Sequence, residues 1–226
     1  MARHQRDPIS LPLWPLPLLA AALPLLVTHL AWWLSVSDGL APACNPYLDG
    51  CLSISRAARD GLGNDLFRLA MLPCATLQAL CWVVATGWLR RDAPGAAPAL
   101  SWLGVIAGVA LALYATFLGT EGQIYELLRR YGNVAYFGST GLALLVTLRA
   151  LSWNRRAPAY RVLLVIALVL LAIGLASVAV AYVVEEPKMR DGWRNVLEWH
   201  LGLWLTGIYA VLAWLWRRER WLLTSG

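Results

Sequence analysis

Six apolar segments dominate this chain, and each is long enough to cross a lipid bilayer. They cover residues 11–36, 66–89, 100–119, 134–151, 162–184 and 196–216. A helix needs about 20 apolar residues to span the hydrocarbon core, and the absence of water there excludes open sheets, whose backbone groups would be unpaired. The sequence therefore predicts an all-α polytopic membrane protein, a six-transmembrane-helix bundle that forms a single domain over residues 1–226 with a long external loop at 37–64.

The composition favours the same class and excludes another. Hydrophobic residues make up 59% of the chain and charged residues only 14%, whereas a soluble domain has about 25% charged residues. The net charge of +6 comes from basic residues in short segments between the apolar runs. No continuous basic stripe results, so we expect no nucleic-acid partner. Lys188 is the only lysine beside eighteen arginines, a usage that suggests a GC-rich bacterial genome and hence the inner (cytoplasmic) membrane of a bacterium.

The basic residues also predict the orientation. Eleven lie in the gaps on the side of the termini: Arg3, Arg6, Arg90, Arg91, Arg149, Arg155, Arg156, Arg161, Arg217, Arg218 and Arg220. Eight lie on the other side: Arg56, Arg59, Arg68, Arg129, Arg130, Lys188, Arg190 and Arg194. Because loops rich in Lys and Arg stay in the cytoplasm, we expect both termini there and the 37–64 loop outside.

Proline and small residues predict local features of two helices. The first segment contains four prolines, Pro12, Pro15, Pro17 and Pro24. Proline lacks a backbone N–H and clashes with the preceding turn, so these residues should delay the start of the first helix or kink it. In the third segment Gly104, Gly108 and Ala112 repeat every four residues. This small-xxx-small face predicts close packing against a neighbouring helix.

Polar residues gather on the external side, above all in the 37–64 loop. Its Pro, Tyr and Ile content favours an ordered loop that packs on the bundle. Cys44 and Cys51 would lie in an oxidising compartment, which permits a disulfide, but the sequence leaves open whether they are joined. Cys74 and Cys81 lie seven residues apart on the second helix, about 10 Å, too far to bridge. We expect these two to be packing residues.

Ionisable groups near the membrane are the candidates for chemistry, because a charge in hydrocarbon is costly. Glu198 lies just inside the outer end of the last segment among apolar residues, with His200 two residues later. Asp65 and Glu121 lie at helix ends, where ordinary ion pairs explain them better. His29 and His200 could ligate haem, but no CxxCH motif is present, and neither a metal-ligand spacing nor a nucleotide-binding motif occurs. We expect no cofactor and no metal.

Several short motifs follow one another in a recognisable order. They are Cys44-Asn45-Pro46-Tyr47-Leu48, Ser53-Ile54-Ser55, Arg68, Thr120-Glu121, Asn133, Ser139 and Leu197-Glu198-Trp199. This order resembles that of the FRAG/DRAM/SFK family of six-helix membrane proteins, especially the post-GPI-attachment-to-proteins factors. The resemblance implies lipid remodelling, which in eukaryotic relatives restores a saturated acyl chain to a lyso-GPI anchor. Bacteria make no GPI, so the substrate here would be another lipid, such as a lyso-phospholipid.

These considerations lead to a hypothesis for the site. Arginine binds phosphate in bidentate fashion, and a positioned carboxylate can act as a general base. We expect Glu198, with His200, to activate a hydroxyl, and eight residues to contact the lipid headgroup: Arg56, Arg59, Arg68, Tyr47, Ser53, Ser55, Glu121 and Asn133. The alternative is a non-catalytic lipid-binding or scaffolding protein. A transporter is disfavoured because no inverted repeat is evident. Membrane lipids are the expected partners, and a homo-oligomer or a membrane-protein partner stays open.

Overall fold

The protein is a bundle of long helices, seen here in a computed structural model that describes residues 10–90, 97–152 and 157–224. The described residues form seven helices and two short strands: β1 (Ser10–Pro12), α1 (Pro15–Ser37), α2 (Ile54–Ala57), α3 (Gly61–Arg90), α4 (Ala97–Phe117), α5 (Gln123–Ser152), α6 (Ala157–Val183), α7 (Pro187–Arg218) and β2 (Leu222–Thr224). All the helices except α2 are long and apolar enough to cross a membrane. The predicted all-α polytopic bundle is confirmed.

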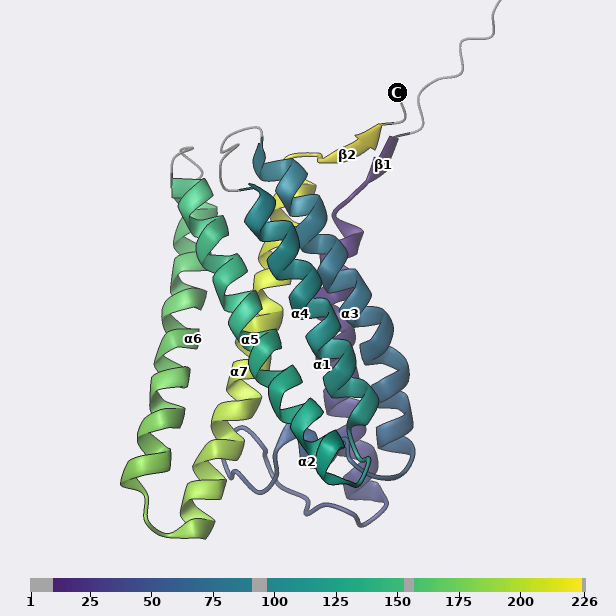
Figure 1. Ribbon diagram of the computed structural model, residues 1–226, viewed down its shortest axis with the longest axis vertical. Helices are drawn as coiled ribbons and strands as arrows, with labels where there is room; N and C mark the ends of the chain where they lie inside the picture. Colours follow the sequence, from purple (N-terminus) through teal and green to yellow (C-terminus); the bar gives the residue numbers. More distant parts are fainter. Residues whose placement is uncertain (1–9, 91–96, 153–156, 225–226) are drawn as a thin grey trace, which may run out of the picture.

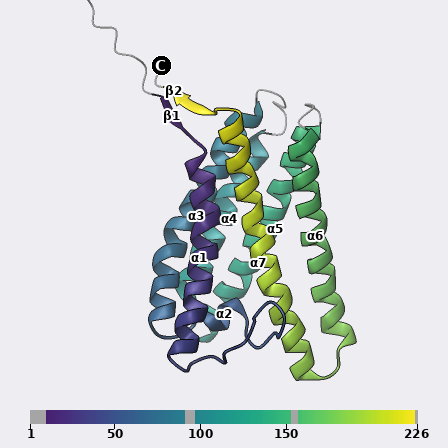
Figure 2. The same cartoon turned by 180° about the vertical axis from the view of Figure 1, so that it is seen from behind.

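The six long helices form a closed ring in sequence order. Each of them contacts the next long helix along the chain, and α7 returns to contact α1. Figures 1 and 2 show α6 at one side of this ring, beside α5 and α7. The ring brings α1 and α7, the first and last helices, into direct contact, so that residues from opposite ends of the sequence can build one site.

The first and last described segments of the chain, β1 and β2, lie at the same end of the bundle. Strand β1 pairs antiparallel with β2, with Ser10 opposite Thr224 and Pro12 opposite Leu222, as the upper part of Figure 1 shows. The Arg217 guanidinium lies 5.2 Å from the centre of the Trp14 ring, a cation–π contact that adds to the pairing. We call this the terminal end of the bundle, and the opposite end, which carries α2 and its loop, the loop end.

The core changes in character along the bundle. Towards the terminal end it is aromatic: the Trp82 indole N–H donates to the Tyr209 hydroxyl over 3.1 Å, and the Trp88 and Trp216 rings lie 6.3 Å apart. Nearer the middle, the Tyr136 hydroxyl donates to Gln78 Oε1 over 2.9 Å. The donors and acceptors of these two hydrogen bonds are partnered, which avoids the cost of unpaired groups in an apolar interior. Cys74 and Cys81 are buried free thiols in α3, in keeping with a packing role.

Several helix boundaries differ from those predicted from hydropathy. Helix α1 begins at Pro15 and not at residue 11, because residues 10–12 form β1. Helices α5 and α7 begin at Gln123 and Pro187, well before the predicted residues 134 and 196. Their first turns are polar, and a helix pairs its own backbone in water as well as in lipid, so hydropathy finds only the apolar part. The α1–α3 loop is also shorter than 37–64, because α3 begins at Gly61.

The glycines of α4 pack closely against α3, as the small-xxx-small face predicted. A Cβ atom on Gly108 would lie 2.8 Å from the Ala79 Cβ and 2.9 Å from the Ala75 carbonyl oxygen, and one on Gly104 would overlap Trp82. Helix α1 begins with a proline and contains Pro24, in line with the expected late start. Among the residues used to predict orientation, Arg3, Arg6, Arg91, Arg155 and Arg156 lie outside the described residues.

Candidate functional site

The α1–α3 loop packs on the bundle and is fixed there by side chains of three helices. Each donates a hydrogen bond to a loop carbonyl: Ser35 to Ala57 over 2.6 Å, Asn64 to Ala58 over 2.8 Å, Asn195 to Gly50 over 2.8 Å and Trp199 to Leu52 over 2.9 Å. Gly50 has a φ of +62° and lies against the backbone of Gly192 in α7, a conformation and an approach that suit only glycine. The loop is therefore an ordered cover over the loop end.

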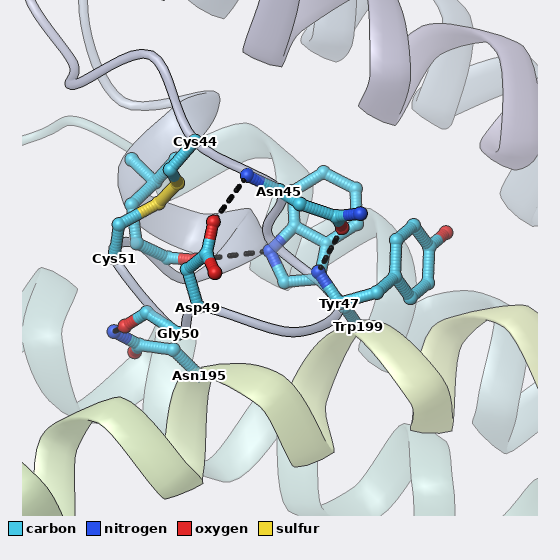
Figure 3. Close-up of a disulfide and its surroundings, with 9 residues drawn as sticks. Cys44, Asn45, Tyr47, Asp49, Gly50, Cys51, Asn195 and Trp199 are labelled. Carbon is cyan, nitrogen blue, oxygen red and sulfur yellow. Dashed lines mark hydrogen bonds between the residues drawn. A yellow bond between two sulfur atoms is a disulfide. The ribbon is translucent and has the colours of Figure 1, made fainter.

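A disulfide between Cys44 and Cys51 closes the first turn of this cover. Their Cα atoms are 6.5 Å apart, and the turn between them is braced by hydrogen bonds from the Asn45 amide to Asp49 Oδ2 and from the Tyr47 amide to Asn45 Oδ1. Figure 3 shows the turn lying over α7, with Tyr47 near Trp199. The sequence left this pairing open, and the bond constrains the segment that carries Tyr47.

Tyr47 joins two histidines from different helices. Its hydroxyl donates to His29 Nε2 over 3.0 Å, and His29 Nδ1 donates to the Leu25 carbonyl over 2.7 Å. Burial raises the pKa of the Tyr47 phenol, so the phenol keeps the proton that it donates to His29. His200 Nε2 lies 3.3 Å from the Tyr47 carbonyl oxygen. Since a carbonyl only accepts, the imidazole N–H is the donor there, and His200 is a support for the loop.

Beneath the loop lies a cavity of about 90 Å³ inside the ring. Helices α1, α3, α4, α5 and α7 form its walls, and Ile54 of α2 closes it from the loop side. Its polar lining residues are Thr28, Tyr114, Asn133, Tyr136, Glu198 and Thr206. Asn133 is exposed on the surface of α5, so the cavity reaches the outside of the bundle beside this helix.

Glu198 is the acidic residue of this cavity. One of its carboxylate oxygens accepts a hydrogen bond from the Ser55 backbone N–H of α2 over 3.2 Å. The guanidinium groups of Arg56 and Arg194 interact with it electrostatically. The side chain is only partly exposed, and it lines the cavity. A carboxylate held in this way can accept a further hydrogen bond, or a proton, from a molecule in the cavity.

The predicted headgroup arginines occupy different environments. Arg68 donates through Nη2 to the Thr116 carbonyl at the end of α4, where helix carbonyls need outside donors. Arg129, which sequence reasoning did not select, does the same for Phe117 over 2.9 Å and also bonds Thr120. Arg59 is exposed and lies close enough to Tyr114 for an electrostatic interaction. Arg68 and Arg129 therefore fix the end of α4, which positions the Tyr114 wall of the cavity.

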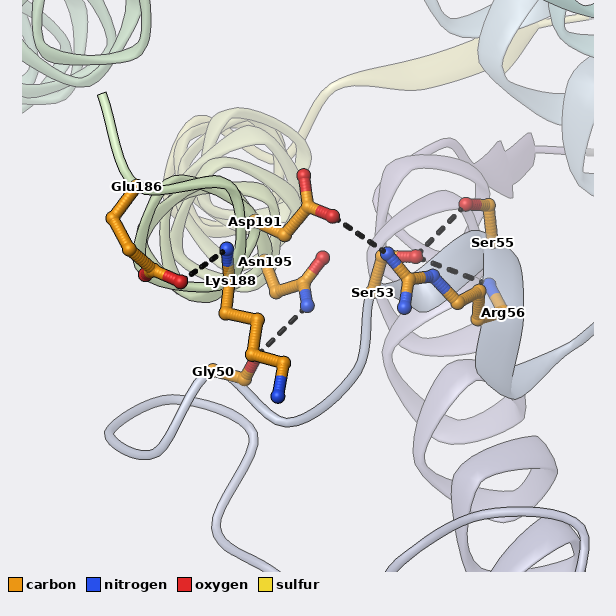
Figure 4. A network of polar contacts seen from close by, with 8 residues as sticks. All are labelled: Gly50, Ser53, Ser55, Arg56, Glu186, Lys188, Asp191 and Asn195. Carbon is orange, nitrogen blue, oxygen red and sulfur yellow. Dashed lines mark hydrogen bonds and ion pairs between the residues drawn. The ribbon is translucent and has the colours of Figure 1, made fainter. Parts of the chain in front are cut away.

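The remaining predicted residues are divided between the cavity and its surroundings. Arg56 is exposed and pairs with Asp191 at 4.0 Å, and the Ser53 hydroxyl accepts from the Arg56 N–H over 3.2 Å and lies 3.0 Å from the Ser55 hydroxyl. Figure 4 shows these groups between α2 and the start of α7. Glu121 is exposed in the α4–α5 loop and does not line the cavity. Of the predicted set, Glu198 and Asn133 line the cavity, and Ser55 and Arg56 act on Glu198 from outside it, through a backbone N–H and electrostatically.

Two features of the site escaped the sequence analysis. Tyr114 and Tyr136 line the cavity, yet each occurs in an apolar run where an aromatic residue has no distinctive signal. Asn195 and Trp199 flank Glu198 at spacings of three and one residues, and both hold the loop. The available sequence signal was the polar residue Asn195 just before the apolar segment 196–216, which could have indicated a hydrogen bond to the loop.

The six membrane-spanning helices, the disulfide-bonded cover and the cavity that contains Glu198 define a multi-pass membrane protein with a carboxylate-bearing chamber at its loop end. Comparison with protein-family models, curated proteins and solved structures finds no match for this chain. The resemblance to the FRAG/DRAM/SFK family therefore stays a prediction from the sequence motifs, and the function is inferred from the cavity.

Proposed function

We propose that this protein acts on a membrane lipid whose headgroup occupies the cavity, and that Glu198 is the group that acts on it. The observation that carries the proposal is a carboxylate facing a cavity inside a ring of transmembrane helices. Ionisable groups at such depth are costly, and where they occur they usually mark functional sites. The cavity also reaches the bundle surface at Asn133, which gives a lipid a path from the membrane.

Four arginines near the cavity, outside its lining, suit a phosphate-bearing headgroup. Arg56 and Arg194 interact electrostatically with Glu198, and Arg59 and Arg129 with Tyr114. Guanidinium groups bind phosphate with charge-assisted hydrogen bonds. The Glu198 carboxylate would accept a hydrogen bond from a hydroxyl or ammonium group of the same headgroup. A lyso-phospholipid carries both a phosphate and a free hydroxyl, and is therefore the substrate class that we infer.

The reaction that fits these groups is acyl transfer. Glu198 accepts the proton of the lyso-lipid hydroxyl as the lipid oxygen attacks the carbonyl carbon of an acyl ester or thioester donor. The new ester bond forms as the bond from that carbon to the donor oxygen or sulfur breaks. The departing alcohol or thiol then takes the proton from Glu198, which restores the carboxylate. General acid–base help of this kind is worth about 10²–10⁴-fold in rate.

One observation favours the second candidate, a non-catalytic lipid-binding protein. The hydrogen bond to Glu198 comes from the backbone N–H of Ser55, and His200 bonds a loop carbonyl. In the described part of the chain, Glu198 and His200 do not form the nucleophile-and-base pair that covalent catalysis uses. Direct acyl transfer needs no such pair, because the lipid hydroxyl itself is the nucleophile. Both candidates share the same cavity and differ in whether the lipid changes.

An assay of lipid masses tests the proposal. The purified protein in lipid nanodiscs is incubated with isotope-labelled palmitoyl lysophosphatidylethanolamine and an excess of diacyl phospholipid as donor. We expect a labelled diacyl product by mass spectrometry, and none in nanodiscs without the protein. Binding of the labelled lipid with no change in its mass would favour the non-catalytic candidate. If the protein neither binds the labelled lipid nor changes its mass, a lyso-phospholipid site is excluded.

We further propose that the loop end faces the outside of a bacterial cytoplasmic membrane and that both termini are cytoplasmic. The excess of basic residues in the sequence gaps on the side of the termini, eleven against eight, supports this orientation. A fluorescent protein fused after Gly226 should be bright and alkaline phosphatase at the same place inactive. Phosphatase inserted after Gly39, where a Cβ atom would have no neighbour within 4 Å, should be active. The opposite pattern would reverse the topology and place the cavity on the cytoplasmic side.

A further inference from the structure

A long apolar groove runs along the bundle between α5, α6 and α7. Its volume is about 610 Å³, within the range of about 300–1,000 Å³ found for ligand sites. Every lining residue is Phe, Leu, Ala or Gly. Three of them, Gly138, Gly141 and Gly174, have no atom within 4 Å of the place where a Cβ would be. The glycines therefore leave this space open. Residues of α6 form one side of the groove, and Figure 2 shows this helix beside α5 and α7.

The groove and the cavity adjoin each other. Phe137 of α5 and Leu205 of α7 line both spaces. A molecule with a polar group beside Glu198 and an apolar tail could therefore occupy the two spaces at once, passing between Phe137 and Leu205. These shared residues indicate what the groove holds, because a cavity that carries the Glu198 carboxylate beside a wholly apolar groove matches the two parts of an amphiphile.

The residues of α5 follow the same order of polarity. Arg129, Asn133, Phe137, Gly141 and Leu145 recur every four residues, and residues at this spacing form a continuous ridge on a helix. The ridge changes from charged to polar to apolar as it leaves the loop end. From Phe137 to Leu148 the groove extends over twelve residues of α5, whose ends lie about 16 Å apart along the helix, about half of the 30 Å hydrocarbon core. That length corresponds to the depth of one lipid leaflet.

We propose that this groove holds an acyl chain of the lipid whose headgroup lies in the cavity. This inference rests on the proposed function and adds how the acyl chain of that lyso-phospholipid is recognised: one long chain that enters sideways from the membrane. The chain would lie against Gly138 and Gly141 of α5 and Gly174 of α6, and the headgroup would stay near Asn133 and Glu198. The site would then select its lipid by chain length as well as by headgroup.

Substitutions that fill the groove test this assignment. Gly141→Leu and Gly174→Leu each place a side chain in the open space, and leucine favours a helix more than glycine does. Gly87→Leu is the matched control, because Gly87 is exposed on α3 and also has no neighbour within 4 Å of a Cβ. The probes are palmitoyl and hexanoyl lysophosphatidylethanolamine, which share a headgroup, and binding is measured by native mass spectrometry in nanodiscs.

We expect both groove-filling variants to bind the palmitoyl lipid about tenfold more weakly than the wild type, the cost of overpacking a filled site. Binding of the hexanoyl lipid to these variants should stay within about twofold of the wild type. Gly87→Leu should bind both lipids as the wild type does. A photoreactive group at the end of the palmitoyl chain should label α5 or α6. Unchanged palmitoyl binding in both variants, or labelling of a second copy of the chain, would overturn the groove assignment while headgroup binding stands. Failure of the wild type to bind either probe would overturn the proposed function as well.

Discussion

Replacing Glu198 by glutamine is expected to lower lipid turnover by about 100-fold or more while the protein stays folded. Glutamine keeps an oxygen that can accept the Ser55 N–H, which now lies 3.2 Å from the carboxylate, so the contact between α7 and α2 should persist. It cannot accept the proton of a lipid hydroxyl, and loss of a general base costs about 10²–10⁴-fold in rate. The measurement is the initial rate of labelled diacyl product in nanodiscs, with the thermal midpoint of the same preparation as the test of folding.

Glu185→Gln is the matched control for this experiment. Glu185 is exposed in the segment between α6 and α7, so the same change in charge is made at the same end of the bundle but outside the cavity. Its turnover should equal that of the wild type. If Glu198→Gln turns lipid over at the wild-type rate, Glu198 has no part in the chemistry. If the wild type and Glu198→Gln bind labelled lipid equally and neither of them converts it, the cavity binds lipid without catalysis.

The fold could be predicted from the sequence because the membrane imposes a simple rule. Each spanning segment must be apolar and must pair its own backbone groups, so hydropathy alone located all six helices. The same rule stops at the membrane surface. Helices α5 and α7 continue into polar sequence, where local hydropathy no longer distinguishes helix from loop. Helix α2 has only four residues, and its contacts, including Trp199 with the Leu52 carbonyl, come from residues far away in the sequence.

The site was only partly predictable for a related reason. Glu198 could be found because a charge among apolar residues is conspicuous by itself, whereas its partners depend on how the helices meet. From the sequence, Arg68 was predicted to bind a headgroup, yet it donates a hydrogen bond to a carbonyl at the end of α4. The last carbonyls of a helix have no partner within the helix, and no local sequence pattern reveals which side chain will bind them. His200 lies two residues from Glu198, and residues at this spacing do not share a helix face. It contacts the Tyr47 carbonyl instead of the cavity.

The largest expected effect on stability is that of Gly108→Leu in α4. A Cβ at this position would already lie 2.9 Å from the Ala75 carbonyl oxygen and 2.8 Å from the Ala79 Cβ. The first of these atoms belongs to the α3 backbone and cannot rotate away, so the two helices must separate. Overpacking of a close contact costs about 1–3 kcal/mol and occasionally more, and a leucine adds three carbons beyond Cβ. We therefore expect about 3 kcal/mol or more of destabilisation, measured as a lower thermal midpoint in detergent or a loss of folded protein.

Two comparisons separate packing from the change of residue type. Gly87→Leu introduces the same side chain into α3 at an exposed position with no atom within 4 Å of a Cβ. It should be neutral or stabilising, since glycine in a helix interior costs about 1 kcal/mol relative to good helix formers. Gly108→Ala should lie between the two, because its gain in helix propensity offsets part of the overlap. An equal midpoint for Gly108→Leu and Gly87→Leu would mean that α3 and α4 do not approach closely at Gly108, and the Tyr114 wall of the cavity, carried by the same helix, would then lack its support.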